Sequence, residues 1–242
     1  MQEWYNPAMT NDQVIMLQKE LAFLYRVAKT VHSLELDEVL KEIVGIASEI
    51  THADSVLIYT LDSKKQQLVL RASKNPHKDL LKKITIHVGE GITGWVAREK
   101  KPVAISDGAR RDPRFKLFRS LPEDKFEAFL SVPILSKRVV GVINVQHQAP
   151  HVHTKMEVDL LAAMGKLVGG SVENALLIEE TLELKDALEL RKLLDKAKGI
   201  LIKRRQISED EAYKILQKES MDTRKSLKEV AEAVLLINKL TL

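Results

Sequence analysis

Hydrophobic and polar positions change their period twice along the chain, which separates two helical regions from a strand-rich middle. Residues 10 to about 50 follow a helical period, residues 55–146 form short apolar runs between turns, and residues from 154 onward are helical again. A first helix is predicted with one narrow apolar seam, typical of a helix–helix contact, at Val14, Leu17, Leu21, Leu24, Ala28 and Val31. A second helix is predicted from about Asp37 to Thr51.

Six β-rich runs in the middle region predict strands at residues 55–61, 66–72, 84–88, 102–106, 129–135 and 139–145. Pro133 lies inside the fifth run and has no backbone N–H, so this strand is expected at an edge of the sheet or at a bulge. Hairpin-linked strands with helices before and after them indicate an α+β fold: an antiparallel sheet of about six strands flanked by helices.

A long helix is predicted from Thr154, which forms a capping box with Glu157, to about Arg205. Apolar residues recur at steps of three and four in two stripes: Leu161, Met164, Val168, Val172 and Ala175, then Ala187, Leu190, Leu194, Ala197 and Leu201. We expect these stripes to pair with a second copy of the chain as a coiled coil, and the alternative is a helix that folds back on its own sheet. Gly169–Gly170 and Gly199 are the places where this helix could bend.

The C-terminal segment breaks into shorter helices. Ser208 and Glu211 form another capping box, and a last amphipathic helix is predicted in SLKEVAEAVLLINKL. The expected organisation is a strand-rich domain with an N-terminal dimerisation helix at 1–178, a coiled-coil linker helix at 179–196 and a small three-helix domain at 197–242.

Composition narrows the chemistry. The 242 residues are 45% hydrophobic and include no cysteine, which excludes disulfides, thiolate metal sites and cysteine nucleophiles. Neither a secretory signal nor an apolar run of about 20 residues is apparent, so we expect a cytoplasmic protein that does not associate with a membrane.

The sequence shows no arrangement of acid, base and nucleophile, and an enzyme is not expected. It has no G-x-S-x-G, phosphate-loop or H-E-x-x-H motif, and the glycines of GEGITGWV (residues 89–96) are better explained by a tight turn before a helix. His147, His151 and His153 lie within seven residues, but a surface loop explains them as well and no acidic ligand is adjacent in the sequence. No metal site is therefore predicted.

The strand-rich region resembles a GAF domain, a small-molecule sensory fold. The matching stretches are GEGITGWVAREKKPVAISD (89–107), DPRF (112–115), FLSVPILSKRVVGVINVQ (129–146) and ENALL (173–177). The resemblance covers residues 20–178 and implies a ligand cavity beneath a lid. The candidate pocket residues are Asp107, Arg110, Phe115, Phe118 and Phe126; their alternative role is to complete a small core. The absence of cysteine excludes a covalently held bilin and cysteine-based sulfoxide reduction, and the cofactor or ligand stays unnamed.

The C-terminal segment resembles an ANTAR domain, an RNA-binding antiterminator module. The match runs from Ala197 to Val234 and includes the AKGIL opening, Ser208-x-x-Glu211-Ala212-Tyr213 and Lys225-x-Leu227-x-x-Val230-Ala231. Two positions depart from the family pattern: Ile202 replaces a usual methionine, and Gln217 stands where arginine is common. The resemblance implies a bacterial GAF–ANTAR regulator that binds paired RNA hairpins as a dimer.

Charge supports this interpretation in part. Residues 195–242 hold eleven basic and eight acidic side chains, a net charge of +3 out of +4 for the whole chain. The candidate RNA-binding residues are Lys198, Lys203, Arg204, Arg205, Tyr213, Gln217, Lys218, Arg224 and Lys225. Tyr213 either stacks on an unpaired base or plugs the core of the small domain.

Three functions therefore compete. The leading hypothesis is a ligand-modulated, dimeric RNA-binding antitermination regulator. The alternatives are a dimeric GAF-fold adaptor that signals through protein contacts of its C-terminal helices, and a GAF-fold enzyme, for which the sequence supplies no nucleophile or poised acid–base pair.

Overall fold

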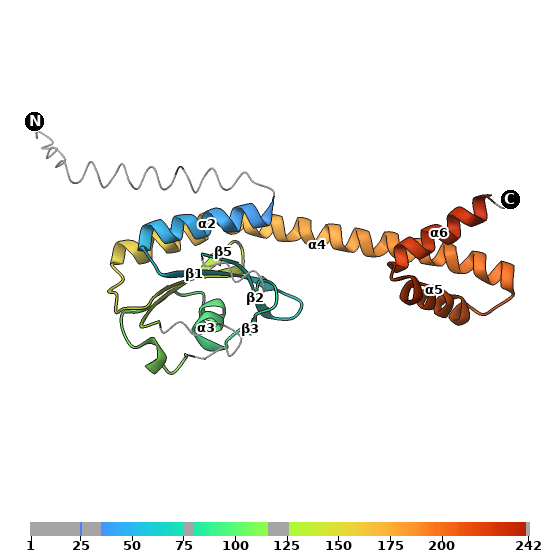
Figure 1. Cartoon of the computed structure of the whole chain (residues 1–242). Coiled ribbons are helices and arrows are strands. Elements are labelled where there is room, and N and C mark those ends of the chain that lie inside the picture. The colour runs from blue at the N-terminus through green and yellow to red at the C-terminus, as the bar shows by residue number, and fades with distance from the viewer. Residues whose placement is uncertain (1–24, 26–34, 75–79, 116–125, 241–242) are drawn as a thin grey trace, which may run out of the picture. The chain divides into compact units, whose positions relative to one another are not determined.

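The computed structural model describes residues 25, 35–74, 80–115 and 126–240 (Figure 1). All six residues of the predicted helical seam at Val14–Val31 lie outside these residues. The elements of the first part are α2 (Leu36–Thr51), β1 (Ser55–Asp62), β2 (Gln67–Ser73), β3 (Thr85–His87), α3 (Gly91–Glu99), β4 (Val103–Ile105), η1 (Ala109–Arg111), β5 (Ala128–Leu135) and β6 (Val139–His147). They are followed by α4 (Lys155–Arg205), α5 (Glu209–Thr223) and α6 (Leu227–Leu240).

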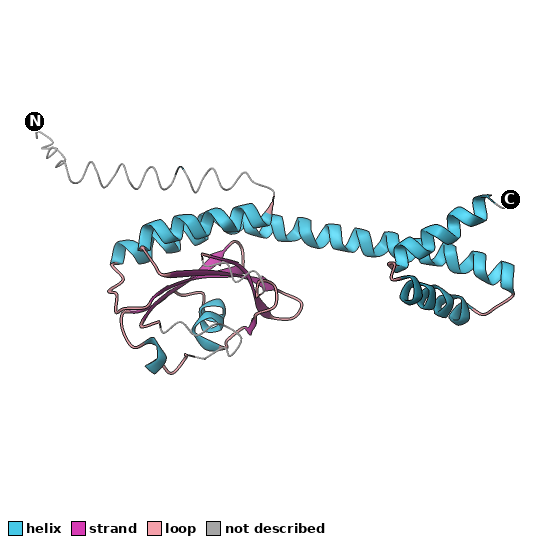
Figure 2. Ribbon diagram, in the orientation of Figure 1, coloured by secondary structure: helices cyan, strands magenta, loops and turns pink. Residues whose placement is uncertain are grey.

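The strands form one antiparallel sheet in the order β3-β2-β1-β6-β5-β4, which confirms the predicted α+β class. Figure 2 shows α2 and the first part of α4 along one face of this sheet and α3 on the other. The two faces have separate apolar clusters: Leu40, Ile43 and Val132 belong to the first, and Leu68, Val96 and Val142 to the second. Burial on both faces is why the central strands β1, β5 and β6 are buried along most of their length.

β5 is not an edge strand, because it lies between β6 and β4. The expectation of an edge position for Pro133 is therefore wrong. The alternative expectation was a bulge, and the register of β5 with β6 does shift next to Pro133, between Ile134 and Leu135. β4 pairs only with residues 129–131, so Pro133 lies beyond that pairing and needs no hydrogen bond to β4.

α4 is a single helix of 51 residues, as the sequence predicts, but its first apolar stripe does not form the expected contact between chains. Leu161, Met164, Val168, Val172 and Ala175 are all buried in the cluster between α2, α4 and the sheet. The prediction that this stripe forms a dimer seam is wrong, and the alternative of a helix folded on its own sheet is correct for this part. A stripe with a helical period does not reveal whether its partner is its own sheet or another chain.

The chain divides into two compact units, Met1–Leu176 and Leu177–Leu242. In the second unit the end of α4 packs with α5 and α6 around Ala197, Leu216, Val230 and Ala231, with Leu194 and Leu201 at the margin. The second predicted stripe of α4 thus also ends in a core of its own unit. This is the predicted three-helix bundle.

Three capping boxes begin the last three helices. Those of α4 and α5 are the predicted pairs: Thr154 with Glu157, and Ser208 with Glu211. The third joins Ser226 and Glu229 at the start of α6 and was not anticipated, although it has the same spacing.

One window of α4 is apolar enough to cross a membrane by length and composition alone, and 44% of it is buried inside the protein. The stripe from Leu161 to Ala175 accounts for this apolar character by packing on the sheet.

Candidate functional site

The end of α4 presents three consecutive exposed cations, Lys203, Arg204 and Arg205. Successive residues of a helix are rotated by about 100°, so these side chains spread around the axis. The helix then stops at Gln206, whose φ of 54° is left-handed, and its N–H donates to the carbonyl oxygen of Ile202. The three cations therefore lie at the start of the turn that leads into α5.

α5 buries Ala212 and Leu216 and turns its opposite face to solvent. The exposed face carries Tyr213, Lys214, Gln217, Lys218 and Met221. Tyr213 is 40% exposed and does not belong to the buried cluster of the bundle. Its ring is therefore accessible from solvent, unlike the expected alternative of a core plug.

The turn between α5 and α6 holds Arg224 and Lys225 in a fixed backbone. Arg224 has a φ of 54°, and the Lys225 N–H donates to the carbonyl of Ser220. The Ser220 hydroxyl in turn donates to the Lys225 carbonyl at 2.6 Å. Both cationic side chains are exposed at this turn.

Lys198 differs from the other predicted cations. Its Nζ lies 2.8 Å from Asp195 Oδ1 and 2.6 Å from Glu209 Oε1, and its side chain is only 15% exposed. These hydrogen bonds raise the pKa of Lys198 and lower that of Asp195. Lys198 thus joins α4 to the first turn of α5, and two carboxylates already compensate its charge.

A hollow of about 390 Å³ lies on the α3 side of the first unit, lined by Gly89, Gly91, Trp95, Arg98, Pro113, Arg114 and Phe115. Of the predicted pocket residues that the structure describes, Phe115 alone lines it. Asp107 pairs with Arg111 at 3.5 Å, Arg110 is exposed, Phe126 is half-buried, and Phe118 lies outside the described residues. Asp107, Arg110 and Phe126 therefore do not line this hollow.

The wall of the hollow combines a cation with an aromatic ring. The Arg114 guanidinium stands 4.8 Å from the Trp95 ring centroid, and Asp112 holds it by two hydrogen bonds of 2.8 and 2.7 Å. The hydrogen bond from Arg114 lowers the pKa of Asp112. Both Trp95 and Arg114 lie in the stretches that carry the GAF resemblance, so the sequence offered a means of finding them.

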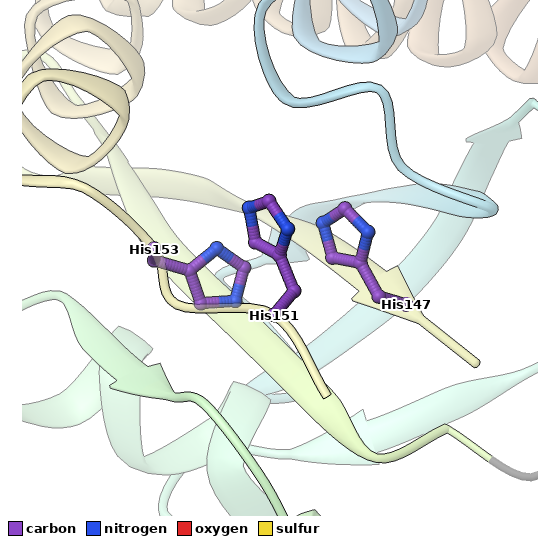
Figure 3. A group of neighbouring side chains, drawn as sticks. All are labelled: His147, His151 and His153. Carbon is purple, nitrogen blue, oxygen red and sulfur yellow. The ribbon is translucent and has the colours of Figure 1, made fainter. Parts of the chain in front are cut away.

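His147, His151 and His153 form a cluster of a different kind (Figure 3). The His147 and His151 rings stack with centroids 4.0 Å apart, and the His153 ring lies 4.9 Å from that of His151. Glu157 Oε1 is 3.1 Å from His151 Nε2. His151 and His153 lie in a loop after the last strand, as expected, but the expectation that no acidic group is adjacent is wrong, because the first turn of α4 brings Glu157 back to His151.

Two of these residues have buried ring nitrogens without hydrogen-bond partners. Among the described residues, nothing pairs with His147 Nε2 or with either ring nitrogen of His153. Burial, followed by the charge of His151, lowers the pKa of His147, and the same causes lower the pKa of His153 to about 4. A buried polar group without a partner costs about 1–3 kcal/mol, so this arrangement calls for a specific explanation.

Comparison with protein families decides the class of the chain. A GAF domain model matches residues 33–173, and an ANTAR domain model matches residues 182–235. This chain belongs to the GAF family and carries an ANTAR domain. The resemblances inferred from sequence are confirmed for both regions.

Curated relatives of this GAF–ANTAR chain include regulatory proteins. The Nif-specific regulatory protein of Herbaspirillum seropedicae is 30% identical over 198 residues, which are 75% of this chain and 36% of that protein. The transcriptional regulatory protein PdtaR of Mycobacterium tuberculosis is 39% identical over 77 residues, 32% of this chain and 38% of that protein. The phosphoenolpyruvate-dependent phosphotransferase system of Escherichia coli is 30% identical over 112 residues, 46% of this chain and 15% of that protein. The chain thus spans well under half of each relative.

Solved structures agree on the fold of the GAF domain. The GAF domain of a phosphoenolpyruvate-protein phosphotransferase from Coxiella burnetii matches with a TM-score of 0.61 and 22% identity, covering 67% of this chain and 98% of that one. The corresponding Acinetobacter domain matches with a TM-score of 0.59 and 23% identity, covering 71% and 99%.

Proposed function

We propose that this GAF–ANTAR protein is a dimeric regulator that binds hairpins in nascent RNA and favours transcription antitermination. The observation that carries the proposal is an ANTAR domain in which the exposed face of α5 combines cations with an accessible aromatic ring. Single-stranded loops are read by such combinations, because cations neutralise phosphates and aromatic rings stack on unpaired bases. The regulatory character of both domain families favours this role over an enzymatic one.

The proposed RNA surface takes most of the residues predicted from sequence: Lys203, Arg204, Arg205, Tyr213, Gln217, Lys218, Arg224 and Lys225. Lys214 joins them because it lies between Tyr213 and Lys218 on the exposed side of α5. Lys198 is assigned a supporting role instead, since Asp195 and Glu209 already bind its ammonium group.

The proposed dimer contact lies in the middle of α4. Leu177, Thr181, Leu184 and Leu188 follow steps of four, three and four residues, and all are exposed. This stripe has the spacing of a coiled-coil seam, and a second copy of the chain would cover it with an identical stripe.

The proposed ligand site is the hollow beside Trp95 and Arg114. A flat polar molecule suits its wall, because Trp95 offers a stacking surface and the Asp112–Arg114 and Arg98–Glu99 ion pairs offer polar groups beside it. A ligand there changes RNA affinity only as far as it prefers one conformation of the chain, and such couplings are typically about 5–150-fold. Native mass spectrometry of the freshly purified protein tests whether a small molecule is retained.

The test of the function is the affinity of the full chain for an RNA of two small hairpins with hexanucleotide loops. The control is an RNA of the same composition that cannot pair. The proposal predicts clear preference for the hairpins. Equal binding to both RNAs would mean that the basic surface binds RNA only nonspecifically, through its charge. No binding to either RNA would favour the alternative of an adaptor that acts through protein contacts.

A further inference from the structure

We propose that His147, His151 and His153 form a binding site for a divalent transition-metal ion, with Glu157 as the positioning carboxylate. Each histidine offers one ring nitrogen, and these three atoms all lie within 4.8 Å of one another. Imidazole nitrogen is a preferred ligand of Zn²⁺, Co²⁺, Ni²⁺ and Cu²⁺. Among these ions, Zn²⁺ is the one that this site is expected to bind.

Backbone hydrogen bonds hold His147 and His151 in this arrangement. His147 ends β6, and its carbonyl oxygen accepts from the Glu127 N–H at 2.9 Å. The loop after β6 is attached to the end of β4, since the His151 N–H donates to the Ser106 carbonyl at 2.9 Å. His153 directly precedes Thr154, the N-cap of α4. The cluster is therefore built from a strand end, an anchored loop and a helix cap.

Burial argues that the rings are gathered for a ligand. His147 and His153 are 7% and 9% exposed, and Figure 3 shows their rings on either side of the His151 ring. A neutral imidazole has one N–H donor and one lone pair. A lone pair that faces no N–H group stays without a hydrogen bond even when three rings pack together. A metal ion accepts lone pairs from all three at once.

Glu157 selects the coordinating atom of His151. Its Oε2 accepts from the Thr154 N–H at 2.6 Å, and its Oε1 lies 3.1 Å from His151 Nε2. An Nε2–H that donates to this carboxylate leaves Nδ1 of His151 with the free lone pair. This is the carboxylate–histidine–metal arrangement that orients metal ligands in many proteins.

Binding of an ion would require the ring nitrogens to move closer together than they are in this arrangement. Zn–N bonds of about 2.0–2.1 Å in a tetrahedron place two ligand nitrogens about 3.3 Å apart. The stacked His147 and His151 rings must turn out of their parallel arrangement to direct lone pairs at one ion, and the half-buried His151 is the ring with most room to do so. Three protein ligands leave a fourth position, which water or a small anion would fill.

The experiment uses untagged, full-length protein that is first freed of metal by a chelator. Co²⁺ is titrated while the visible absorption of tetrahedral Co²⁺ is followed, and Zn²⁺ is then added as competitor. The proposal predicts one Co²⁺ per chain with tetrahedral bands, which Zn²⁺ abolishes. A parent protein without these bands overturns the proposal, whether or not any variant folds.

Variants locate the site. His151→Asn is the most informative because His151 is only half-buried, and it is expected to weaken Zn²⁺ binding by at least tenfold. Glu157→Gln keeps the capping box, which accepts Gln at this position, and is expected to weaken binding by about 10–100-fold. His52→Asn and His87→Asn change exposed histidines elsewhere and are expected to bind like the parent. Equal Zn²⁺ affinity in His151→Asn and the two controls overturns the proposal.

Discussion

Gly169 of α4 lies directly against the carbonyl oxygen of Leu135 at the end of β5, and a Cβ on this residue would overlap that oxygen. One turn earlier, Gly165 stands in the same relation to the carbonyl of Pro133. α4 therefore approaches the backbone of β5 through two glycines on one face. At Gly169 the small residue serves close packing, and α4 continues through it without a break.

Alanine substitutions at the neighbouring Gly169 and Gly170 should therefore change the stability of the protein in opposite directions. Gly169→Ala is expected to destabilise the protein by about 1–3 kcal/mol, because the added methyl group overpacks the contact with β5. Gly170→Ala meets nothing within 4 Å and is expected to stabilise by up to about 1 kcal/mol through helix propensity. Urea unfolding measures both, and equal changes in the two variants would contradict close packing at Gly169.

The buried and the exposed stripes of α4 involve different residues, which gives a second prediction. Val168→Asp places a charge in the buried cluster of the GAF domain and is expected to prevent stable folding. Leu184→Asp, in the exposed stripe, is expected to preserve the fold and shift the mass in light scattering to that of a monomer. Leu182→Asp is the control, since it is also exposed but lies about 160° around the helix from Leu184. A dimer that survives Leu184→Asp would place the contact elsewhere.

Periodicity was sufficient to predict the elements of this fold but not their partners. The stripe at Leu161–Ala175 was read correctly as one face of a helix, yet period alone does not distinguish an intramolecular sheet from a second chain. The capping boxes at Thr154 and Ser208 were readable because they depend on residues three apart. Ser226 and Glu229 have the same spacing, so the third capping box is also present in the sequence pattern.

The features of the candidate sites that could not be predicted depend on contacts between segments far apart in the sequence. Arg114 reaches Trp95 across 19 positions, and only the fold shows that the two form one wall of a hollow. Lys198 looked like a free cation, because its partner Glu209 belongs to the next helix. The histidines looked like an ordinary loop, because the buried positions of His147 and His153 depend on how that loop lies against the sheet and α4.

The Lys198–Glu209 contact predicts a loss of stability without a matching loss of RNA contacts. Lys198→Met and Glu209→Gln should each lower the melting temperature, and the double variant should lose less than the two separate losses combined. The shared ion pair is the reason, since either change alone removes it. Full additivity in this double-mutant cycle would show that the contact contributes nothing.

Low pH should destabilise α5 and α6, because it protonates the glutamates of their capping boxes. Hydrogen bonds from Ser208 and Ser226 lower the pKa values of Glu211 and Glu229 below their ordinary 4.5. A lowered pKa in the folded state gives stability that is complete above 4.5 and lost as the pH falls through the folded value. Ser208→Ala and Ser226→Ala are each expected to cost about 0.5–2 kcal/mol at neutral pH and to weaken this acid dependence. Circular dichroism during acid titration measures it, and an unchanged profile in both variants would contradict the assignment.

The most direct test of RNA recognition is the salt dependence of hairpin binding by the full chain. Each phosphate contact that is lost should reduce the slope of log affinity against log salt by about 0.7–0.9. Arg205→Ala and Lys218→Ala are expected to weaken binding and flatten the slope by that amount, with the melting temperature unchanged. Lys166→Ala removes an exposed charge from α4 within the GAF domain and should match the parent. Hairpin affinity and slope that are the same in all four proteins would contradict an RNA-binding surface at the end of α4 and on α5.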